Sequence, residues 1–160
     1  MTAYLGLGTN LGEDKAANLQ HAVDMLHEQA GHVLACSSFM ETEPWGFTSD
    51  NAFLNAVVEV DTPHTPYELL HITQKIEREM GRTEKSVNGV YHDRVIDIDL
   101  LKALLPSNSP YEGENYAEGD EVVCCTETLT LPHPRMHERD FVLLPLREVE
   151  TILKPLASNL

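Results

Sequence analysis

The residue types and spacing best suited to chemistry are those of Asp97 and Asp99, two aspartates separated by one isoleucine. Side chains alternate between the faces of a β-strand, so a strand here places both carboxylates on one face. Their Cα atoms would lie about 6.5 to 7 Å apart. Like charges this close are costly unless a cation or solvent lies between them. Two oxygen ligands at this spacing suit Mg²⁺, which completes its coordination with water and substrate phosphates.

The alternative to a metal site is that Asp97 and Asp99 simply form the solvent-facing side of an ordinary amphipathic strand. The surrounding sequence helps to decide between the two. Basic residues gather before the aspartates, at Arg82, Lys85 and Arg94, in a chain with only 11 basic residues against 26 acidic ones. A magnesium-bound polyphosphate needs such cations for the charge that the metal leaves unneutralised. The clustering therefore favours an anion site, and a second group of donors follows downstream at His133, Arg135, His137 and Arg139.

Composition limits what the chain can be. Its 160 residues, 42% hydrophobic and 23% charged, are typical of one folded domain spanning residues 1–160. A formal charge of −15 would repel nucleic acid. The sequence has no apolar run of about 18 residues, no basic leader, and three cysteines without disulfide or metal spacing. We expect a cytoplasmic monomer with no membrane or nucleic-acid partner.

Hydrophobic periodicity predicts the elements that hold these residues. The order strand, helix, strand, strand, helix, strand favours an α+β fold, with a ferredoxin-like antiparallel sheet and helices packed on one face. The second and third strands would pair antiparallel. A helix near the C-terminus and a flexible acidic insertion at 106–121 complete the domain. The predicted strands span 2–8, 32–40, 53–61, 95–101 and 122–131, and the predicted helices 15–30, 66–80 and 139–149.

Aromatic and amide side chains suggest a binding place for a flat ligand. Trp45 and Phe47 lie in a loop with proline and glycine at 43–51, and Phe53 follows it. Aromatic residues usually belong to the core, but in such a loop they are candidates for stacking on a heterocycle. The amide of Asn55 could read a ring edge with its donor and its acceptor.

With these features the sequence resembles the 6-hydroxymethyl-7,8-dihydropterin pyrophosphokinase family, whose members are also called 2-amino-4-hydroxy-6-hydroxymethyldihydropteridine diphosphokinases. The resemblance covers nearly the whole chain. Its most specific parts are Arg94-x-x-Asp97-x-Asp99 and the downstream Pro132-His133 with Arg139 and Phe141. The other segments that carry it are Gly6-Leu7-Gly8-Thr9-Asn10-Leu11-Gly12, Glu41-Thr42-Glu43-Pro44-Trp45-Gly46, Phe53-Leu54-Asn55-Ala56, Glu77 and Gly81-Arg82.

The resemblance implies an enzyme of folate biosynthesis. It would transfer the β,γ-diphosphate of ATP to the hydroxymethyl group of 6-hydroxymethyl-7,8-dihydropterin and release AMP, using two Mg²⁺ ions. The matching positions imply catalytic roles for Arg82, Arg94, Asp97 and Asp99, of which the two aspartates bind metal. They imply pterin-binding roles for Thr42, Pro44, Trp45, Phe53, Asn55 and Phe141, and nucleotide-binding roles for Glu77, Ile98, Leu129, Thr130, His133 and Arg139.

Two other functions stay open. A magnesium-dependent nucleotidyltransferase would use the same aspartate pair, but its substrate would attack the α-phosphorus and release pyrophosphate. A non-catalytic ferredoxin-like module would bind a small ligand at its sheet and would not need two metal ions.

Overall fold

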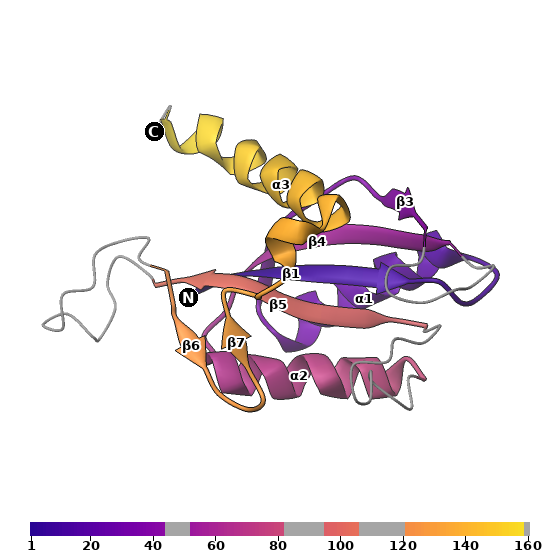
Figure 1. Cartoon of the computed structure of the whole chain (residues 1–160), viewed down its shortest axis with the longest axis horizontal. Coiled ribbons are helices and arrows are strands. Elements are labelled where there is room, and N and C mark those ends of the chain that lie inside the picture. Colours follow the sequence, from indigo (N-terminus) through magenta and orange to yellow (C-terminus); the bar gives the residue numbers. More distant parts are fainter. Residues whose placement is uncertain (44–51, 82–94, 106–120, 159–160) are drawn as a thin grey trace, which may run out of the picture.

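The chain builds an antiparallel sheet with helices on both of its faces (Figure 1). The computed structural model describes residues 1–43, 52–81, 95–105 and 121–158, the last eight by their backbone alone. Among these residues, no helix is long and apolar enough to cross a membrane. The elements are β1 (Thr2–Thr9), α1 (Lys15–Gln29), β2 (His32–Cys36), β3 (Met40–Thr42), β4 (Phe53–Asp61), α2 (Pro66–Glu79), β5 (Asp97–Leu104), β6 (Cys124–Cys125), β7 (Thr130–Leu131), a 3-10 turn (Met136–Glu138) and α3 (Asp140–Ser158).

The strand order of the main sheet is β2-β4-β1-β5, with β3 also paired to β4, and each of these pairs is antiparallel. With β2 and β3 read as one interrupted strand, this is the ferredoxin-like order, so the predicted α+β fold class is confirmed. Helices α1 and α2 cover one face as expected. The C-terminal helix covers the opposite face, because that face also carries buried apolar residues such as Val57 and Leu101 (Figure 1).

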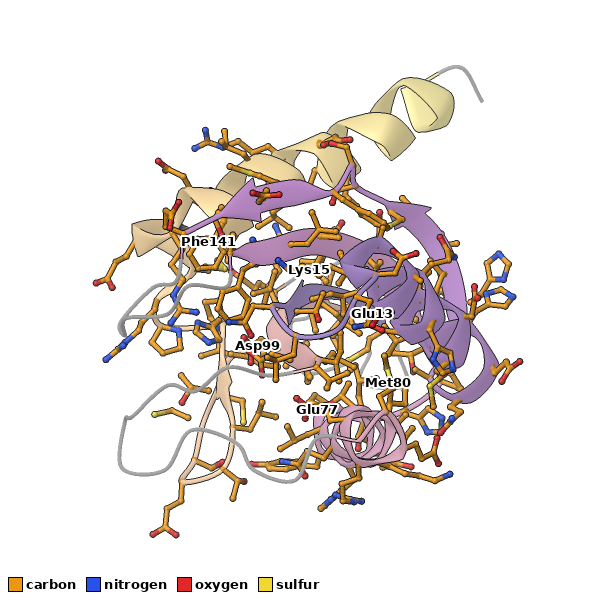
Figure 2. All side chains as sticks on the ribbon, turned by 90° about the vertical axis from the view of Figure 1, so that its right-hand side faces the viewer. Glu13, Lys15, Glu77, Met80, Asp99 and Phe141 are labelled. Carbon is orange, nitrogen blue, oxygen red and sulfur yellow. The ribbon has the colours of Figure 1, made fainter. Side chains whose placement is uncertain are left out.

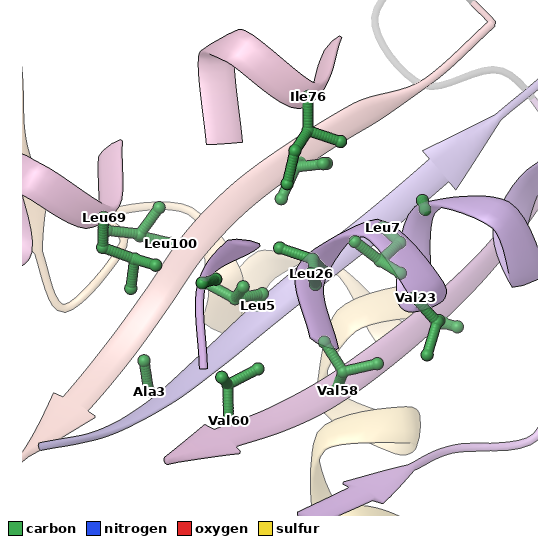
Figure 3. Packing of buried hydrophobic residues seen from close by; sticks show 14 of the residues in the cluster. Ala3, Leu5, Leu7, Val23, Leu26, Val58, Val60, Leu69, Ile76 and Leu100 are labelled. Carbon is green, nitrogen blue, oxygen red and sulfur yellow. The ribbon is translucent and has the colours of Figure 1, made fainter. Parts of the chain in front are cut away.

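The larger part of the core lies between the sheet and helices α1 and α2 (Figure 3). Alternate residues of β1, β4 and β5 point to this side, as the period-2 pattern predicts. The helices meet them with residues spaced three and four apart. The side chains packed here include Leu5, Leu7, Val58, Val60 and Leu100 from the strands and Val23, Leu26, Leu69 and Ile76 from the helices.

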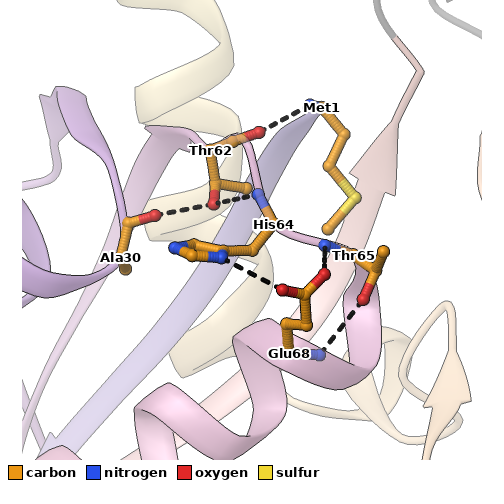
Figure 4. Close-up of polar contacts among 6 residues, drawn as sticks. All are labelled: Met1, Ala30, Thr62, His64, Thr65 and Glu68. Carbon is orange, nitrogen blue, oxygen red and sulfur yellow. Dashed lines mark hydrogen bonds and ion pairs between the residues drawn. The ribbon is translucent and has the colours of Figure 1, made fainter.

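Polar contacts fix the ends of the elements at one edge of this core (Figure 4). The Thr62 hydroxyl donates to the Ala30 carbonyl at 2.6 Å, just past the end of α1. The amino group of Met1 donates to the Thr62 carbonyl at 2.7 Å. Helix α2 then begins with a capping box between Thr65 and Glu68. Gly31 is required between α1 and β2, because a Cβ there would overlap the backbone of residue 61.

The predicted strand 32–40 is wrong in one respect, since it is divided into β2 and β3. The Ser37 hydroxyl oxygen accepts the Val57 N–H at 2.9 Å, and the Ser37 N–H donates to the Val57 carbonyl at 2.9 Å. A side chain thus takes the place of a backbone carbonyl in the ladder. Regular pairing stops there and resumes at Met40.

The predicted strand 122–131 is also wrong as a single element, because it folds back as the hairpin β6-β7. The Thr126 N–H donates to the Leu129 carbonyl at 2.9 Å, and the Thr126 hydroxyl oxygen accepts the Leu129 N–H at 3.2 Å, which closes the turn. Strand β5 begins and ends later than predicted, and α3 is longer. The predicted loop at 43–51 and the insertion at 106–121 lie almost wholly outside the described residues.

Two buried polar side chains, Tyr4 and Glu59, form a hydrogen-bonded pair under α3, at the end of the sheet where β1 begins. The Tyr4 hydroxyl donates to Glu59 Oε1 at 3.1 Å, and both side chains are buried. Lys102 pairs with Glu150 of α3 and lies 5.0 Å from the centre of the Tyr4 ring. Burial raises the pKa of Glu59, and the hydrogen bond from Tyr4 offsets part of this rise.

We predict that Glu59→Gln stabilises the protein at neutral pH. A carboxyl group whose pKa is higher in the folded than in the unfolded protein lowers the stability as the pH rises from the unfolded-state pKa through the folded-state pKa. The reason is that the folded state resists ionisation of the group. Glutamine keeps the acceptor for Tyr4 and removes the charge. The variant should exceed the wild type by about 1 kcal/mol at pH 7, and the two should agree below about pH 4. Urea unfolding across this pH range measures the difference, and a pH-independent difference would contradict the assignment.

Candidate active site

The register of the sheet aligns the aspartates with two glycines of β1. Asp97 lies opposite Gly8 and Asp99 opposite Gly6. On the other side of β1, Asn55 of β4 is also opposite Gly8. Residues paired across neighbouring strands point to the same face. Asp97, Gly8 and Asn55 therefore form one row across three strands, at the end where β1 finishes and β4 and β5 begin.

The predicted alternation along β5 is confirmed. Ile98 and Leu100 are buried against α1 and α2, whereas Asp97 and Asp99 are half-buried on the other face. Leu101, further along that face, belongs to the core under α3. The two carboxylates thus lie on the α3 side of the sheet, beyond the apolar part of that face.

Two glycines of β1 lie beside the aspartates. Neither needs an unusual backbone conformation, since of Gly6, Gly8 and Gly12 only Gly12 has a positive φ, of 101°. Gly6 and Gly8 lie inside the strand. A Cβ on Gly8 would lie 3.3 Å from Asn55 Oδ1 and 3.6 Å from the Phe53 ring. Gly8 therefore keeps space open beside Asp97, Asn55 and Phe53.

Hydrogen bonds from other elements hold the outer edge of β5. The Glu77 side chain, 2% exposed on α2, accepts the Ile98 N–H through Oε2 at 3.2 Å. The His133 N–H donates to the Leu101 carbonyl at 2.7 Å. The strand that carries the aspartates is therefore fixed on both edges, by β1 on one and by these two bonds on the other. Glu77 and His133 lie along its outer edge, at Ile98 and Leu101. His133 follows the cis peptide between Leu131 and Pro132.

Strands β3 and β4 orient the amide of Asn55, which is 5% exposed. Its Nδ2 donates to the Met40 carbonyl at 3.1 Å and to Thr42 Oγ1 at 2.8 Å. These two bonds use both amide hydrogens and direct Oδ1 toward Gly8. The structure thus brings together Thr42, Phe53 and Asn55 of the predicted pterin-binding residues.

The start of α3 adds an aromatic ring and a cation. The Arg139 guanidinium, in a side chain 8% exposed, lies 5.8 Å from the centre of the Phe141 ring. This distance is within the range of a cation–π contact. Figure 2 looks onto this end of the molecule and shows Phe141 beside α3, Asp99 below it and Glu77 on α2.

Other predicted residues are less closely tied to the aspartates. Leu129 is buried at the β6-β7 turn, and Thr130 is half-buried in β7. Both belong to the hairpin beside β5 (Figure 1). The predicted residues Pro44, Trp45, Arg82 and Arg94 lie outside the described residues.

Sequence reasoning missed Lys15. Its Nζ donates to the Ala52 carbonyl at 2.8 Å, so α1 holds the chain directly before Phe53. The sequence carries no signal for this contact, because a lysine at a helix start is ordinary and residues 15 and 52 are far apart. We expect it to fix where β4 begins.

The aspartate pair would supply only part of the ligands that a bound metal ion needs. In the part of the chain that the structure describes, no three His, Cys, Asp or Glu side chains lie close enough to hold a metal ion. Two carboxylates alone leave most of an octahedral coordination shell to water and substrate.

Comparison with known proteins gives consistent matches to one family. The model of the 7,8-dihydro-6-hydroxymethylpterin-pyrophosphokinase family matches residues 4–151. The chain is 49% identical over 156 residues to a 2-amino-4-hydroxy-6-hydroxymethyldihydropteridine pyrophosphokinase of Porphyromonas gingivalis, covering 98% of this chain and 95% of the relative. It is 41% identical over 148 residues to the Bacillus subtilis protein of the same name, covering 92% and 77%.

Solved structures match the fold. HPPK is the abbreviated name of the same family. An HPPK-DHPS protein in complex with substrates superposes with a TM-score of 0.62 at 18% identity, and wild-type HPPK-DHPS of Plasmodium falciparum superposes with a TM-score of 0.61 at 16% identity. The match covers 92% of this chain and 40% of each of those longer chains. At this identity the likeness establishes the fold alone.

We predict that Glu77→Ala destabilises the protein by about 2 to 3 kcal/mol. The change removes the acceptor of a buried N–H and leaves a cavity beside β5. Glu77→Gln keeps an acceptor and should lose less. The control is Glu79→Ala, whose more exposed carboxylate pairs with Lys75 on the same helix and should matter by less than about 1 kcal/mol. Urea unfolding measures all three, and equal losses for Glu77→Ala and Glu79→Ala would contradict the buried role.

Proposed function

The chain belongs to the 7,8-dihydro-6-hydroxymethylpterin-pyrophosphokinase family, and from this premise we propose its reaction and the residues that perform it. It transfers the β,γ-diphosphate of ATP to the hydroxymethyl group of 6-hydroxymethyl-7,8-dihydropterin and releases AMP, as a step of folate biosynthesis. The observation that carries the proposal is the row of Asp97, Gly8 and Asn55, with Asp99 on the same face of β5, because it places two carboxylates near an amide and the space that Gly8 keeps open.

Asp97 and Asp99 are the proposed metal ligands, for two Mg²⁺ ions. Their support is chemical: both are half-buried carboxylates on one face, and a site with few protein ligands suits an ion that keeps places for phosphate and water. Bound magnesium would neutralise phosphate charge and lower the pKa of the attacking hydroxyl. The protein's own contribution is to hold the two carboxylates side by side at the end of the sheet.

The pterin ring would lie over the Gly8 space, between the Phe53 and Phe141 rings. Aromatic rings stack favourably on a flat heterocycle. Because both hydrogens of the Asn55 amide are used by Met40 and Thr42, Asn55 would meet the ligand as an acceptor, through Oδ1. An acceptor suits the N–H groups on the edge of a pterin. Pro44 and Trp45 are proposed for the same pocket by the resemblance alone.

The nucleotide would lie along the outer edge of β5. This edge, with the neighbouring hairpin and the start of α3, carries the proposed nucleotide-binding residues. Arg82 and Arg94 are proposed to close over the phosphates, on the resemblance alone. The proposed nucleotide set is Glu77, Ile98, Leu129, Thr130, His133 and Arg139.

The chemical step needs positioning more than covalent help from the protein. The hydroxymethyl oxygen attacks the β-phosphorus in line, a new phosphorus–oxygen bond forms, and the bond to the bridging oxygen of the α-phosphate breaks. AMP leaves with that oxygen, and the hydroxyl proton passes to solvent. Phe53, Asn55 and Phe141 hold the nucleophile, and the arginines offset the charge of the transferred group.

We further propose that residues 1–160 act as one domain, with the acidic segment 106–121 as a surface insertion. The enzyme would work as a cytoplasmic monomer on small molecules, with no nucleic acid or membrane as partner. The charge of −15 supports the lack of nucleic-acid binding.

Product analysis tests the reaction. Purified protein is incubated with 6-hydroxymethyl-7,8-dihydropterin, ATP and Mg²⁺, and the products are separated by chromatography. We expect AMP and the pterin diphosphate in equal amounts, and none without a divalent cation. Release of pyrophosphate would contradict the proposal and support a nucleotidyltransferase, and ATP binding without turnover would support a regulatory module.

The same assay tests the metal ligands. Asp97→Asn and Asp99→Asn should each lower kcat by at least about 100-fold, because a carboxylate ligand is lost while the side-chain volume is kept. The control is Asp61→Asn, an exposed aspartate where β4 ends, far along the sheet, which should keep full activity. Near wild-type turnover by either site variant would exclude that residue as an essential ligand.

A further inference from the structure

The proposed pterin slot has two walls, the Phe141 ring of α3 on one side and Phe53 with Asn55 of β4 on the other. A carboxylate on α3 is hydrogen-bonded to the sheet side. Glu148 accepts two hydrogen bonds from Ser38, from the backbone N–H to Oε1 at 2.8 Å and from the hydroxyl to Oε2 at 2.8 Å. Ser38 lies in the segment between β2 and β3. Two parallel bonds to one carboxylate restrict both distance and orientation. We refer to this pair as the Glu148–Ser38 tie.

On the sheet side, Ser38 of the tie is connected to Asn55 through the few residues that separate it from Met40. Ser37 is fixed to β4, because its N–H and its hydroxyl both bond to the backbone of Val57 at 2.9 Å. The Ser37 hydroxyl also donates to the Ser38 carbonyl at 2.9 Å. Strand β3 begins two residues after Ser38, and its first residue, Met40, accepts from the Asn55 amide. A displacement of Ser38 would therefore move the Met40 carbonyl that orients the Asn55 amide.

On the helix side, the tie leads to Phe141. Glu148 follows Phe141 by seven residues, which is two turns, so both lie on nearly the same side of α3. Helix α3 packs against β4, β2 and β3. Helix α3, which carries Phe141 in its first turn, is thus held against the sheet at Glu148.

We propose that Glu148 is a positioning residue for the pterin substrate. Acting through Ser38, it sets the separation between the Phe141 ring and the wall formed by Phe53 and Asn55. A ring stacked on both faces needs walls about 7 Å apart, twice the carbon contact distance. A gap of about 1 Å more forfeits up to half of the contact energy on one face. This inference rests on the proposed function, since it concerns the same slot.

The chain offers a matched control on the same helix. Glu150, two residues further on, also joins α3 to the sheet, through its ion pair with Lys102. It has the same charge, but it leads to β5 and the Tyr4 ring, away from β3. Loss of Glu150 should loosen α3 without moving the Asn55 wall.

The experiment measures the Kd of 6-hydroxymethylpterin by calorimetry in the presence of a non-hydrolysable ATP analogue, together with KM for both substrates and kcat. Glu148→Ala should weaken pterin binding about tenfold, with kcat and the ATP KM within about twofold. Glu150→Ala should leave the pterin Kd within about twofold. Glu148→Gln should restore most of the affinity, because its amide oxygen can accept the Ser38 N–H and its amide nitrogen can donate to the hydroxyl.

Two further readouts isolate the tie. Ser38→Ala combined with Glu148→Ala should lose no more affinity than Glu148→Ala alone, because both remove the same contact. Amide hydrogen exchange of residues 38–42 should rise in Glu148→Ala and not in Glu150→Ala, whether or not the reaction is the one proposed. Faster exchange with unchanged pterin affinity would overturn the positioning role alone, as would additive losses or a Glu148→Gln variant as weak as Glu148→Ala. Wild-type protein that binds no pterin would overturn the proposed function, and this inference with it.

Discussion

The repulsion between two neighbouring carboxylates is the constraint on which the proposed site depends. Asp97 and Asp99 stay on one face because Ile98 and Leu100 are buried on the other. Pairing with β1 holds one edge of the strand, and bonds from Glu77 and His133 hold the other. The fold thus supplies the rigidity that two like charges require, and a cation with its phosphate ligands would be stabilising beside them.

The sequence predicts best where local pattern and tertiary packing agree. Alternating residues in 53–61 and at 97–100 specify buried strand faces, and the structure has them. Apolar residues spaced three and four apart specify the helices predicted at 15–30 and 66–80, and the structure has them as α1 and α2. These signals involve residues close together in the chain, so one sequence suffices to read them. The order of the elements then restricts the sheet to few topologies.

The sequence predicts less well where a side chain replaces a backbone group or a contact joins distant residues. Ser37 interrupts a strand because its hydroxyl lies opposite Val57, which no periodicity reveals. The face that α3 covers depends on apolar residues contributed by several strands. The tie between Ser38 and Glu148 joins residues far apart in sequence. The roles of all the proposed site residues stay predictions, and four of these residues, Pro44, Trp45, Arg82 and Arg94, also lie outside the described part of the chain.

The central claim is that the two aspartates of β5 bind the two divalent cations that hold the triphosphate. A crystal structure with a non-hydrolysable ATP analogue and Mn²⁺, with anomalous scattering recorded for manganese, tests it most directly. The account predicts anomalous peaks within about 2.0 to 2.3 Å of carboxylate oxygens of both Asp97 and Asp99, each also in contact with phosphate oxygens. Bound nucleotide with manganese elsewhere, or with both carboxylates turned away from it, would contradict the account.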